Sequence, residues 1–373
     1  MDIMAKPIDK SQIMKLISVW SEELGFDALS VATLDLEADS IELTFWLKQG
    51  LQGTMGYMSK NLEKRSDPKK LFPGTLSVIS ARIQYRSESL SKDRIILGND
   101  TKAFISRYAL GRDYHKTVRS RLKKLGKKLE SKIGRYGHRV FSDSAPVLER
   151  ALARNAGLGW IGKNTMLIDP KAGSYFFLGE IFTDLKLPET NIRIENKCGS
   201  CSKCLDVCPT NAFVSPYKLD ARKCISYLTI ESKDEIPIDL RPLIGNRIFG
   251  CDDCQLICPW NKFAKLSSLS DFNIRNGLDD VSLIKLFLMN YSEFQTITLG
   301  SALRRITHEQ WLRNIAVSLG NAEANKDIIQ ALAVRTNHKS DLVRNHVNWA
   351  INEQKKKLLN ETKTNNCSLN LIG

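Results

Sequence analysis

The sequence predicts an α+β protein in three parts, and three patterns along the chain support this fold class. In residues 1–190, short apolar segments typical of strands alternate with amphipathic helical segments. Residues 191–262 then hold eight of the nine cysteines. Residues 263–357 have helical periodicity and no strand pattern. We therefore expect an N-terminal mixed α/β domain, a cysteine-rich domain and a helical domain, followed by a disordered tail over 358–373.

The first part begins with an amphipathic helix around residues 13–20, where apolar side chains recur at spacings of three and four. Two later segments, 28–33 and 77–83, are rich in β-branched and apolar residues, as strands are. The turn-forming pair Pro73-Gly74 precedes the second segment. These segments predict a sheet in the first part of the chain.

The composition excludes several classes of protein. Hydrophobic residues make up 42% and charged residues 26% of the 373 residues, which are ordinary globular values and exclude a wholly disordered chain. No run of about 18 apolar residues is present, so we expect no transmembrane helix. The N-terminal residues lack the basic and apolar regions of a signal peptide, and we therefore expect a cytoplasmic protein.

Positive charge is concentrated in one segment. The chain has 55 Lys and Arg against 41 Asp and Glu, a net charge of +14. Residues 107–139 hold twelve Lys or Arg against two acids, and those within 116–132 recur at spacings of three and four, on faces of one helix. This density favours contacts with the phosphates of a nucleic acid, and a solvated surface helix is the alternative.

The cysteines form two related runs. The first is Cys198-x₂-Cys201-x₂-Cys204-x₃-Cys208-Pro, the pattern of bacterial ferredoxins. In that pattern the fourth cysteine ligates the neighbouring cluster. The second run, at 251–259, repeats the ending but lacks one cysteine of the first part.

Cys224, which stands between the two runs, can supply the missing ligand and completes two sets of four. One set is Cys198, Cys201, Cys204 and Cys258. The other set is Cys208, Cys224, Cys251 and Cys254. Two 4Fe–4S clusters are the interpretation that the crossed C-x₃-C-P pairs favour, and two structural zinc sites are the alternative. Two neighbouring clusters form an electron-transfer path, and such a path requires a reducible centre as its acceptor.

The helical part contains two pairs of helical segments, at 301–322 and 327–354, as in helical-repeat proteins of the HEAT type. Cys367 lies in the polar tail and has no predicted role. His308 and His346 have no partners that would make them metal ligands.

The segment 143–165 carries a further motif, which begins with Asp143-Ser-Ala-Pro146. By itself this start is typical of a helix N-cap, with the helix entering at the proline. Glycines follow with the spacing of a dinucleotide fingerprint, but no strand precedes them and no acid lies at the expected distance. We therefore reject a nicotinamide site, and we expect these glycines to let the backbone approach a large flat cofactor.

Nearly the whole chain resembles the epoxyqueuosine reductases, except for the tail after about Lys357. The segments that carry the resemblance are SRYALGRDYHKTVRSRLKKL, DSAPVLERALARNAGLGWIGKNT, GSYFFLGE, CGSCSKCLDVCPTNAF, ARKCISYLTIE, GNRIFGCDDCQLICPWN and RRITHEQWLRNIAVSLGNA. The resemblance implies an enzyme that removes the epoxide oxygen of epoxyqueuosine at the wobble position of tRNA, the last step of queuosine synthesis.

The resemblance also implies the cofactors, which are cobalamin and two 4Fe–4S clusters, and a relationship to the reductive dehalogenases. No D-x-H-x-x-G run is present, so we expect base-off cobalamin without a protein histidine on cobalt. The N-terminal domain is then the cobalamin-binding domain. The expected partners are tRNA and an external electron donor of unknown identity. We expect a monomer that does not bind membranes.

The resemblance assigns roles to individual residues. Asp143 is the proton donor, and for this role we expect burial to raise its pKa. The expected cobalamin contacts are Gly159, Lys163, Asn164, Gly173 and Ser174. Weaker candidates are Arg65, Ser106, Asp143 itself, Asp252 and Asp253. Tyr108 and Tyr114 are either site residues or core aromatics.

For tRNA, the candidate surfaces are the basic segment 107–139 and the C-terminal helices. Arg304, Arg305 and Arg313 lie in those helices, and Trp311 beside them is expected to pack between the helices. Two other functions stay open at this point. One is a ferredoxin-type electron carrier without catalysis, and the other is a zinc-stabilised RNA-binding module.

Overall fold

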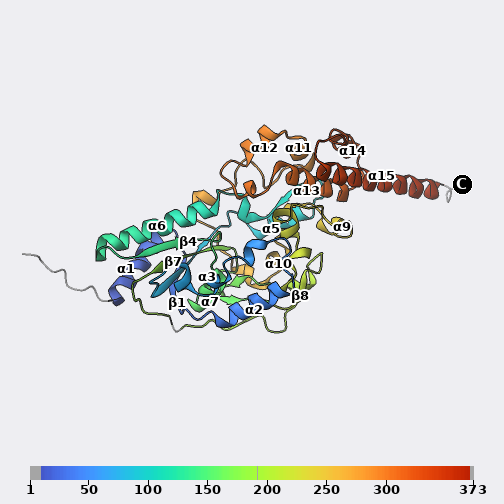
Figure 1. The fold of residues 1–373 in the computed structure, drawn as a ribbon. Coiled ribbons are helices and arrows are strands. Elements are labelled where there is room, and N and C mark those ends of the chain that lie inside the picture. The colour runs from blue at the N-terminus through green and yellow to red at the C-terminus, as the bar shows by residue number, and fades with distance from the viewer. Residues whose placement is uncertain (1–9, 191, 370–373) are drawn as a thin grey trace, which may run out of the picture.

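The structure, a computed structural model, describes residues 10–190 and 192–369. The first part of the chain contains a four-stranded sheet in which all neighbouring strands are antiparallel (Figure 1). In spatial order the strands are β1 (Ala28–Ala32), β2 (Ser77–Gln84), β7 (Phe176–Thr183) and β4 (His138–Phe141). The two strands expected from the sequence are therefore confirmed, with ends that differ by one residue.

Helices and short strands surround this sheet. The helices of the first part are α1 (Lys10–Glu23), α2 (Glu37–Lys48), α3 (Leu62–Ser66), α4 (Pro68–Leu71), α5 (Leu90–Leu97), α6 (Tyr114–Ile133) and α7 (Glu149–Asn155). The short strands are β3 (Phe104–Ile105), β5 (Trp160–Ile161) and β6 (Leu167–Ile168). The mixed α/β character expected for this part is confirmed.

The central strands β2 and β7 are buried on both faces because helices cover both sides of the sheet. Ile79 and Ile181 belong to the apolar cluster that contains the buried face of α6. Val78 and Phe182, which point the opposite way, belong to the cluster around α7. Gly179 of β7 lets α6 approach closely, because a Cβ there would lie 2.7 Å from a methyl group of Val118.

The cysteine-rich part has little regular structure. Its elements are α8 (Lys203–Asp206), β8 (Phe213–Ser215), β9 (Lys218–Leu219), the π-helical turn η4 (Tyr227–Glu231), α9 (Arg241–Ile244), β10 (Arg247–Phe249) and α10 (Asp253–Leu256). β10 pairs in parallel with β3 of the first part. The cysteine-rich part is therefore joined to the first part by a two-stranded sheet as well as by the chain.

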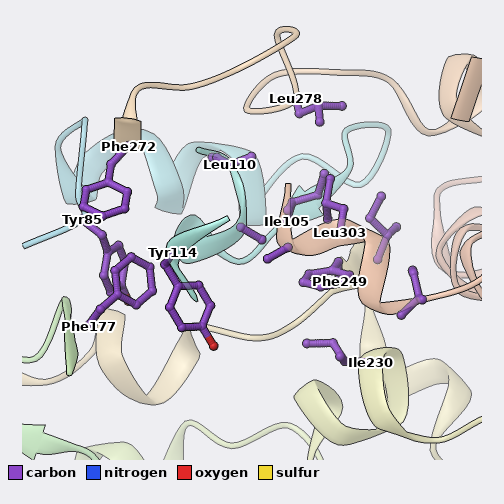
Figure 2. Close-up of a cluster of buried hydrophobic side chains, with 14 of the residues drawn as sticks. Tyr85, Ile105, Leu110, Tyr114, Phe177, Ile230, Phe249, Phe272, Leu278 and Leu303 are labelled. Atoms are coloured by element: carbon purple, nitrogen blue, oxygen red, sulfur yellow. The ribbon is translucent and has the colours of Figure 1, made fainter. Parts of the chain in front are cut away.

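One hydrophobic core runs through all three parts. Figure 2 shows Tyr85 and Phe177 of the first part in the same cluster as Phe249 of the cysteine-rich part and Leu303 of the helical part. Because the core is shared, the three parts are defined by their secondary structure and not by separate cores.

The helical part is confirmed as helical, and no named strand lies in the described residues after β10 (Figure 1). Its helices are α11 (Leu283–Leu288), α12 (Tyr291–Ile297), the 3₁₀ turn η7 (Ala302–Arg305), α13 (His308–Asn321), α14 (Lys326–Ala333) and α15 (Asp341–Leu369). None of the helices in the described residues is both long and apolar enough to cross a membrane.

Two expectations about the helical part need correction. The tail expected to be disordered from 358 is helical as far as Leu369, because α15 continues through it; residues 370–373 lie outside the described ranges. Arg313 does not face a ligand, because it is fully buried and donates to the backbone oxygens of Ser232 and Leu228. Trp311 is fully buried among the helices, as expected.

Candidate active site

Asp143 lies in the loop between β4 and α7, and its side chain does not cap a helix. The helix α7 begins at Glu149, its N-cap position is Leu148, and no side-chain cap is present. The expectation that Asp143 caps a helix entering at Pro146 is therefore wrong. Asp143 instead has a left-handed backbone conformation, with φ of 55°. Aspartate tolerates this conformation better than most residues, and the turn directs its carboxylate away from α7.

Three donors from two distant segments converge on one oxygen of Asp143. Its Oδ2 accepts from the hydroxyl of Tyr114 at 2.5 Å and from the Arg305 guanidinium at 2.7 Å. His115 Nε2 lies 2.9 Å from the same oxygen. Tyr114 is held in place because its ring stacks on Phe177, with centroids 4.2 Å apart, in the core that Figure 2 shows.

These contacts reverse the pKa shift that the sequence analysis expected for Asp143. Burial alone raises the pKa of Asp143, but the hydrogen bond from His115 and the charge of Arg305 outweigh burial and hold the pKa well below its usual range. The expectation of a raised pKa is therefore wrong for this arrangement. Asp143 is a carboxylate here, and a proton that it donates must come from a neighbour.

His115 is the neighbour placed to supply that proton. Its Nδ1 lies 2.8 Å from Oδ1 of Asp113, which also accepts the backbone N–H of His115 at the start of α6. Burial and the nearby Arg305 lower the pKa of His115. The carboxylates of Asp113 and Asp143 raise this pKa by a larger amount, so its net shift is upward. The protonated imidazolium is thereby favoured between two carboxylates.

Two further carboxyl groups lie behind Asp143. Glu149 accepts the backbone N–H of Asp143, which holds the loop at the start of α7. Glu180 of β7 is fully buried, and its carboxyl group interacts with the side chains of Glu149 and Ser80. Burial raises the pKa of both glutamates. The negative charge of Asp143 adds to the shift of Glu149, and that of Glu149 adds to the shift of Glu180. Both are therefore biased towards the neutral form.

Tyr108 lies between Asp143 and the second cysteine run. Its ring packs edge-on against Tyr114. Burial raises the pKa of Tyr108, the charge of Arg305 lowers it, and the charges of Asp143 and Asp252 raise it. Asp252 is the residue after Cys251. The acid–base groups around Asp143 and the second set of cysteines are thus neighbours across Tyr108.

The first set of cysteines surrounds a cavity of about 250 Å³. All four lie in its lining: Cys198, Cys201, Cys204 and Cys258. Burial raises the pKa of the Cys204 thiol to about 11, and the nearby thiols of Cys258, Cys198 and Cys201 contribute to this. Cys258 is thus brought beside the first run, although the second run contains it.

The second set is also gathered. Burial raises the pKa of Cys254, and the thiol that adds most to the shift is that of Cys224. Cys224 in turn interacts with Cys208, and Cys251 interacts with Cys254. A weaker interaction between Cys254 and Cys204 links the two sets.

A 4Fe–4S cluster and a zinc ion place different demands on these thiols. All eight cysteines are free thiols. Among the described residues, no three His, Cys, Asp or Glu side chains converge closely enough to hold one metal ion. A zinc ion needs four ligands within bonding distance of one point, whereas a 4Fe–4S cluster needs thiols spread around a cavity.

Most residues expected to contact cobalamin have partners within the protein. Lys163 donates to the backbone oxygens of Gly199 and Cys201, at 2.7 and 3.0 Å. Asn164 donates to the backbone oxygen of Cys254 at 3.2 Å. These two residues therefore hold one loop of each cysteine set against the first part of the chain.

The other expected contacts are engaged in the same way. Ser174 hydrogen-bonds to Asn261, and Gly173 is needed there because a Cβ would lie 2.2 Å from Oδ1 of Asn261. Gly159 likewise faces the backbone oxygen of Ile168, which a Cβ would approach to 2.4 Å. These residues join the first part to the cysteine-rich part or to its own hairpin.

Two acids of the second run are also paired. Ser106 donates to Asp252 at 2.5 Å, and Arg247 forms two hydrogen bonds of 2.7 Å with Asp253. Arg65 is engaged in part, because its Nη1 and Nη2 donate to the backbone oxygens of Val147 and Tyr57 at 3.4 and 3.3 Å. It is buried, its Nε has no partner among the described residues, and the charges of Tyr57, Glu149 and Asp143 act on it.

The comparisons with known proteins agree with this site. Residues 65–144 match the family model described as "Epoxyqueuosine reductase QueG, DUF1730", and residues 197–261 match "4Fe-4S double cluster binding domain". An epoxyqueuosine reductase of Pseudomonas aeruginosa is 51% identical over 345 residues, covering 92% of this chain and 95% of that protein. The chain belongs to the epoxyqueuosine reductase family.

An epoxyqueuosine reductase of Escherichia coli is 46% identical and covers 94% of this chain and 92% of its own. Solved structures of epoxyqueuosine reductases also match. One, with an epoxyqueuosine-modified tRNA-Tyr stem loop, has a TM-score of 0.84 at 28% identity and covers 93% of this chain and 91% of that chain. Another, from Bacillus subtilis, has its catalytic aspartate loop swung out of the active site; its TM-score is 0.83 at 29% identity, with the same coverage.

Sequence reasoning missed three residues of the site in this member of the family. Arg305 was assigned to a tRNA surface, but it reaches Asp143 and His115. His115 and Glu180 were given no role, although both lie in segments that carry the family resemblance. The sequence held one usable signal, since a charged residue within the otherwise apolar strand 176–183 is unusual.

Proposed function

We propose that this protein reduces epoxyqueuosine to queuosine at the wobble position of tRNA, with electrons relayed through two 4Fe–4S clusters to cobalamin. The observation that supports the proposal is that the chain combines two four-thiol sets with the hydrogen-bonded Asp143, and its relatives carry the name of this activity. Neither a ferredoxin-type carrier nor a zinc module requires the acid–base groups at Asp143.

For the clusters, the proposed ligands are the two sets given by the sequence. The shared cavity lining and the mutual interactions of the thiols support this assignment. Lys163 and Asn164 tie the two cluster loops to the first part of the chain, so they fix the clusters relative to Asp143.

For cobalamin, the fit rests on the group of residues between Asp143 and the second cysteine set. Tyr57, which is 51% exposed, and Asp143, whose side chain is 43% exposed, are available to a bound molecule, and the charges of both act on the buried Arg65. Cobalamin supplies a cobalt centre that stores the electrons delivered singly by the clusters. The remaining expected contacts have protein partners and can meet the cofactor only through their backbone or a free face.

Protonation is the step that this chain's own residues perform. Opening an epoxide builds negative charge on its oxygen, and an acid placed at that oxygen lowers the barrier. Asp143 holds the position, and His115 Nε2 lies one hydrogen bond behind it as the source of the proton. Asp113 orients His115 and stabilises the charged imidazolium. We propose that Asp143 passes this proton to the oxygen, so that its ionised resting state is part of the relay.

Arg305 controls this relay, and its removal should show in the pH dependence. Its charge lowers the pKa of Asp143 and also opposes protonation of His115. In an Arg305→Leu variant both pKa values rise, so the pH limits of single-turnover conversion should move to higher pH. A pH profile measured on cofactor-loaded enzyme tests this, with Arg275→Leu as the control, because Arg275 donates to the backbone oxygen of Leu299. An unchanged profile would show that Arg305 acts only on structure.

For tRNA, the proposed surface is the basic face of α6. Leu122, Leu125 and Leu129 anchor the helix in the core. The exposed Lys123, Lys124 and Lys127 lie on the opposite face. The HEAT-like arrangement proposed for α11–α15 would place a second surface beside it. Arg304 and Arg305 are its two exposed arginines among the three expected, and Arg305 is paired with Asp143.

Reversing the charges of Lys123, Lys124 and Lys127 to Glu should weaken tRNA binding and flatten its salt dependence. When a phosphate contact is lost, binding of the tRNA releases fewer counterions. The slope of log Kd against log salt should therefore fall by about one unit for each lost contact. Fluorescence anisotropy with a labelled anticodon stem loop measures both quantities. Wild-type affinity and slope in the triple variant would move the binding surface to the C-terminal helices.

We also propose that the protein acts as a monomer in the cytoplasm, where its tRNA substrate lies, and that it takes electrons from an external donor. The domain boundaries proposed from the sequence are kept, with the helical end of α15 added to the third part. Anaerobic conversion of epoxyqueuosine in tRNA, followed by nucleoside mass spectrometry, tests the proposed activity.

A further inference from the structure

The indole of Trp160 contacts a cysteine of the first set. Trp160 is 2% exposed at the start of β5, and its Nε1 donates to Sγ of Cys198 at 3.5 Å. Trp260 packs edge-on against it, with ring centroids 5.2 Å apart at 83°. The indole is thus fixed by burial and by ring packing, and its N–H is directed at a sulfur that lines the 250 Å³ cavity.

Thr210 also places a polar side-chain atom near a cysteine sulfur, in this case one of the second set. It is buried, and its Oγ1 lies 3.7 Å from Sγ of Cys208. A cysteine bound to a cluster is a thiolate without a proton, so the hydroxyl must be the donor in that state. The first set therefore has a buried indole donor, whereas the second set has the hydroxyl of Thr210 and also the guanidinium of Arg247, which interacts with Cys251.

Backbone donors do not distinguish the two sets. The N–H of Ala212 donates to Cys208 at 3.3 Å, and backbone N–H groups also lower the pKa of Cys224 and of Cys258. Since both sets receive backbone hydrogen bonds, the side-chain donors are the features that can give each cluster its own environment.

We propose that Trp160 sets the reduction potential of the cluster bound by the first cysteine set, and of that cluster alone. This rests on the proposed cluster ligation. Reduction adds negative charge to the cluster and its thiolates, so a hydrogen bond to a thiolate stabilises the reduced form more than the oxidised form. The indole N–H therefore raises the potential at which this cluster accepts an electron. Trp160 acts through Cys198 and does not touch the substrate.

The test is an anaerobic redox titration of the cobalamin-free full chain, followed by electron paramagnetic resonance. In wild-type protein with full iron content, two midpoint potentials are expected. In Trp160→Phe one of them should fall, with about a tenfold change in the ratio of reduced to oxidised cluster at a fixed potential, which is 59 mV for one electron. Thr210→Val should lower the other midpoint by a smaller amount, because its donor lies farther from the sulfur.

Trp260→Phe is the matched control. It changes a neighbouring ring beside the same cavity but removes no hydrogen bond to sulfur that the structure contains, so both midpoints should keep their wild-type values. If Trp160→Phe and Trp260→Phe shift the same midpoint equally, ring packing sets the potential and the proposal is wrong. The proposal is also wrong if Trp160→Phe moves neither midpoint, moves both, or moves the one that responds to Thr210→Val.

A measurement on wild-type protein covers the case in which Trp160→Phe does not fold. With ¹⁵N in the indole nitrogens, the reduced protein should show hyperfine coupling of one cluster to an indole ¹⁵N, and the coupling should persist in Trp260→Phe. Absence of this coupling overturns the inference but leaves the cluster assignment intact. Wild-type protein that binds no iron after reconstitution would instead overturn the proposed function.

Discussion

Asp143→Asn should retain both clusters and lose about 10²–10⁴-fold of single-turnover conversion, which is the range that general-acid catalysis contributes. The substitution is mild for the fold. Asparagine tolerates the left-handed backbone conformation at φ of 55°, and its amide oxygen can accept from Tyr114 and Arg305. The amide cannot receive the proton of His115 and pass it on. The loss therefore falls on the proton transfer.

This prediction is checked with epoxyqueuosine-containing tRNA under excess strong reductant, with iron and cobalamin content measured on the same sample. Glu63→Gln is a suitable control, because Glu63 is exposed and its ion pair with Lys70 lies away from the site. Near-normal conversion by fully loaded Asp143→Asn would remove Asp143 as the proton donor. Tyr114 and Tyr108 would then be the next candidates.

Cys204→Ser and Cys258→Ser should each abolish the same cluster, although the two cysteines are 54 residues apart in the sequence. Serine is a poor ligand for iron in place of a thiolate, and both sulfurs line one cavity. About half of the bound iron should be lost in either variant, and conversion should stop because the electron path is broken.

Cys254→Ser is the matched comparison, because the thiol that acts most strongly on Cys254 is Cys224 of the second set. It should remove the other cluster and leave the signal that Cys204→Ser abolishes. Paramagnetic resonance of the reduced variants, with iron counted by a chelator assay, separates the outcomes. If Cys258→Ser spoils the same cluster as Cys254→Ser, the crossed pairing is wrong and the runs ligate independently.

The sequence predicted those features that depend on local patterns. Strands β1 and β2 follow from runs of β-branched residues, and α6 follows from the spacing of its leucines. The crossed cysteine sets followed from a spacing rule that encodes the shape of a two-cluster domain. Trp311 was expected to pack between helices because a large apolar side chain on a helical face is most often in the core.

Contacts between distant segments could not be predicted in the same way. Arg305 and Asp143 are 162 residues apart, and nothing local to either residue indicates their pairing. The pKa of Asp143 was predicted in the wrong direction for the same reason, since burial was foreseeable but the donors were not. Lys163 and Asn164 were assigned to cobalamin from the family resemblance, and only the folded chain reveals that their side chains also contact the cluster loops.

The end of the chain was also mispredicted. Polar residues after 357 suggested a frayed tail, but helix-forming Lys, Leu and Glu extend α15, which is already held by its packed first half. A segment that extends an existing helix does not need a new nucleation step.

The most direct test of the account is anaerobic reconstitution of the full chain with iron, sulfide and cobalamin, followed by one turnover on epoxyqueuosine-containing tRNA. Metal analysis, the absorption spectrum and nucleoside mass spectrometry are read from the same sample. We expect about eight iron atoms per chain, which corresponds to two 4Fe–4S clusters. We also expect bound cobalamin and conversion of epoxyqueuosine to queuosine. Zinc in place of iron, or a fully loaded protein that leaves epoxyqueuosine unchanged, would contradict the account.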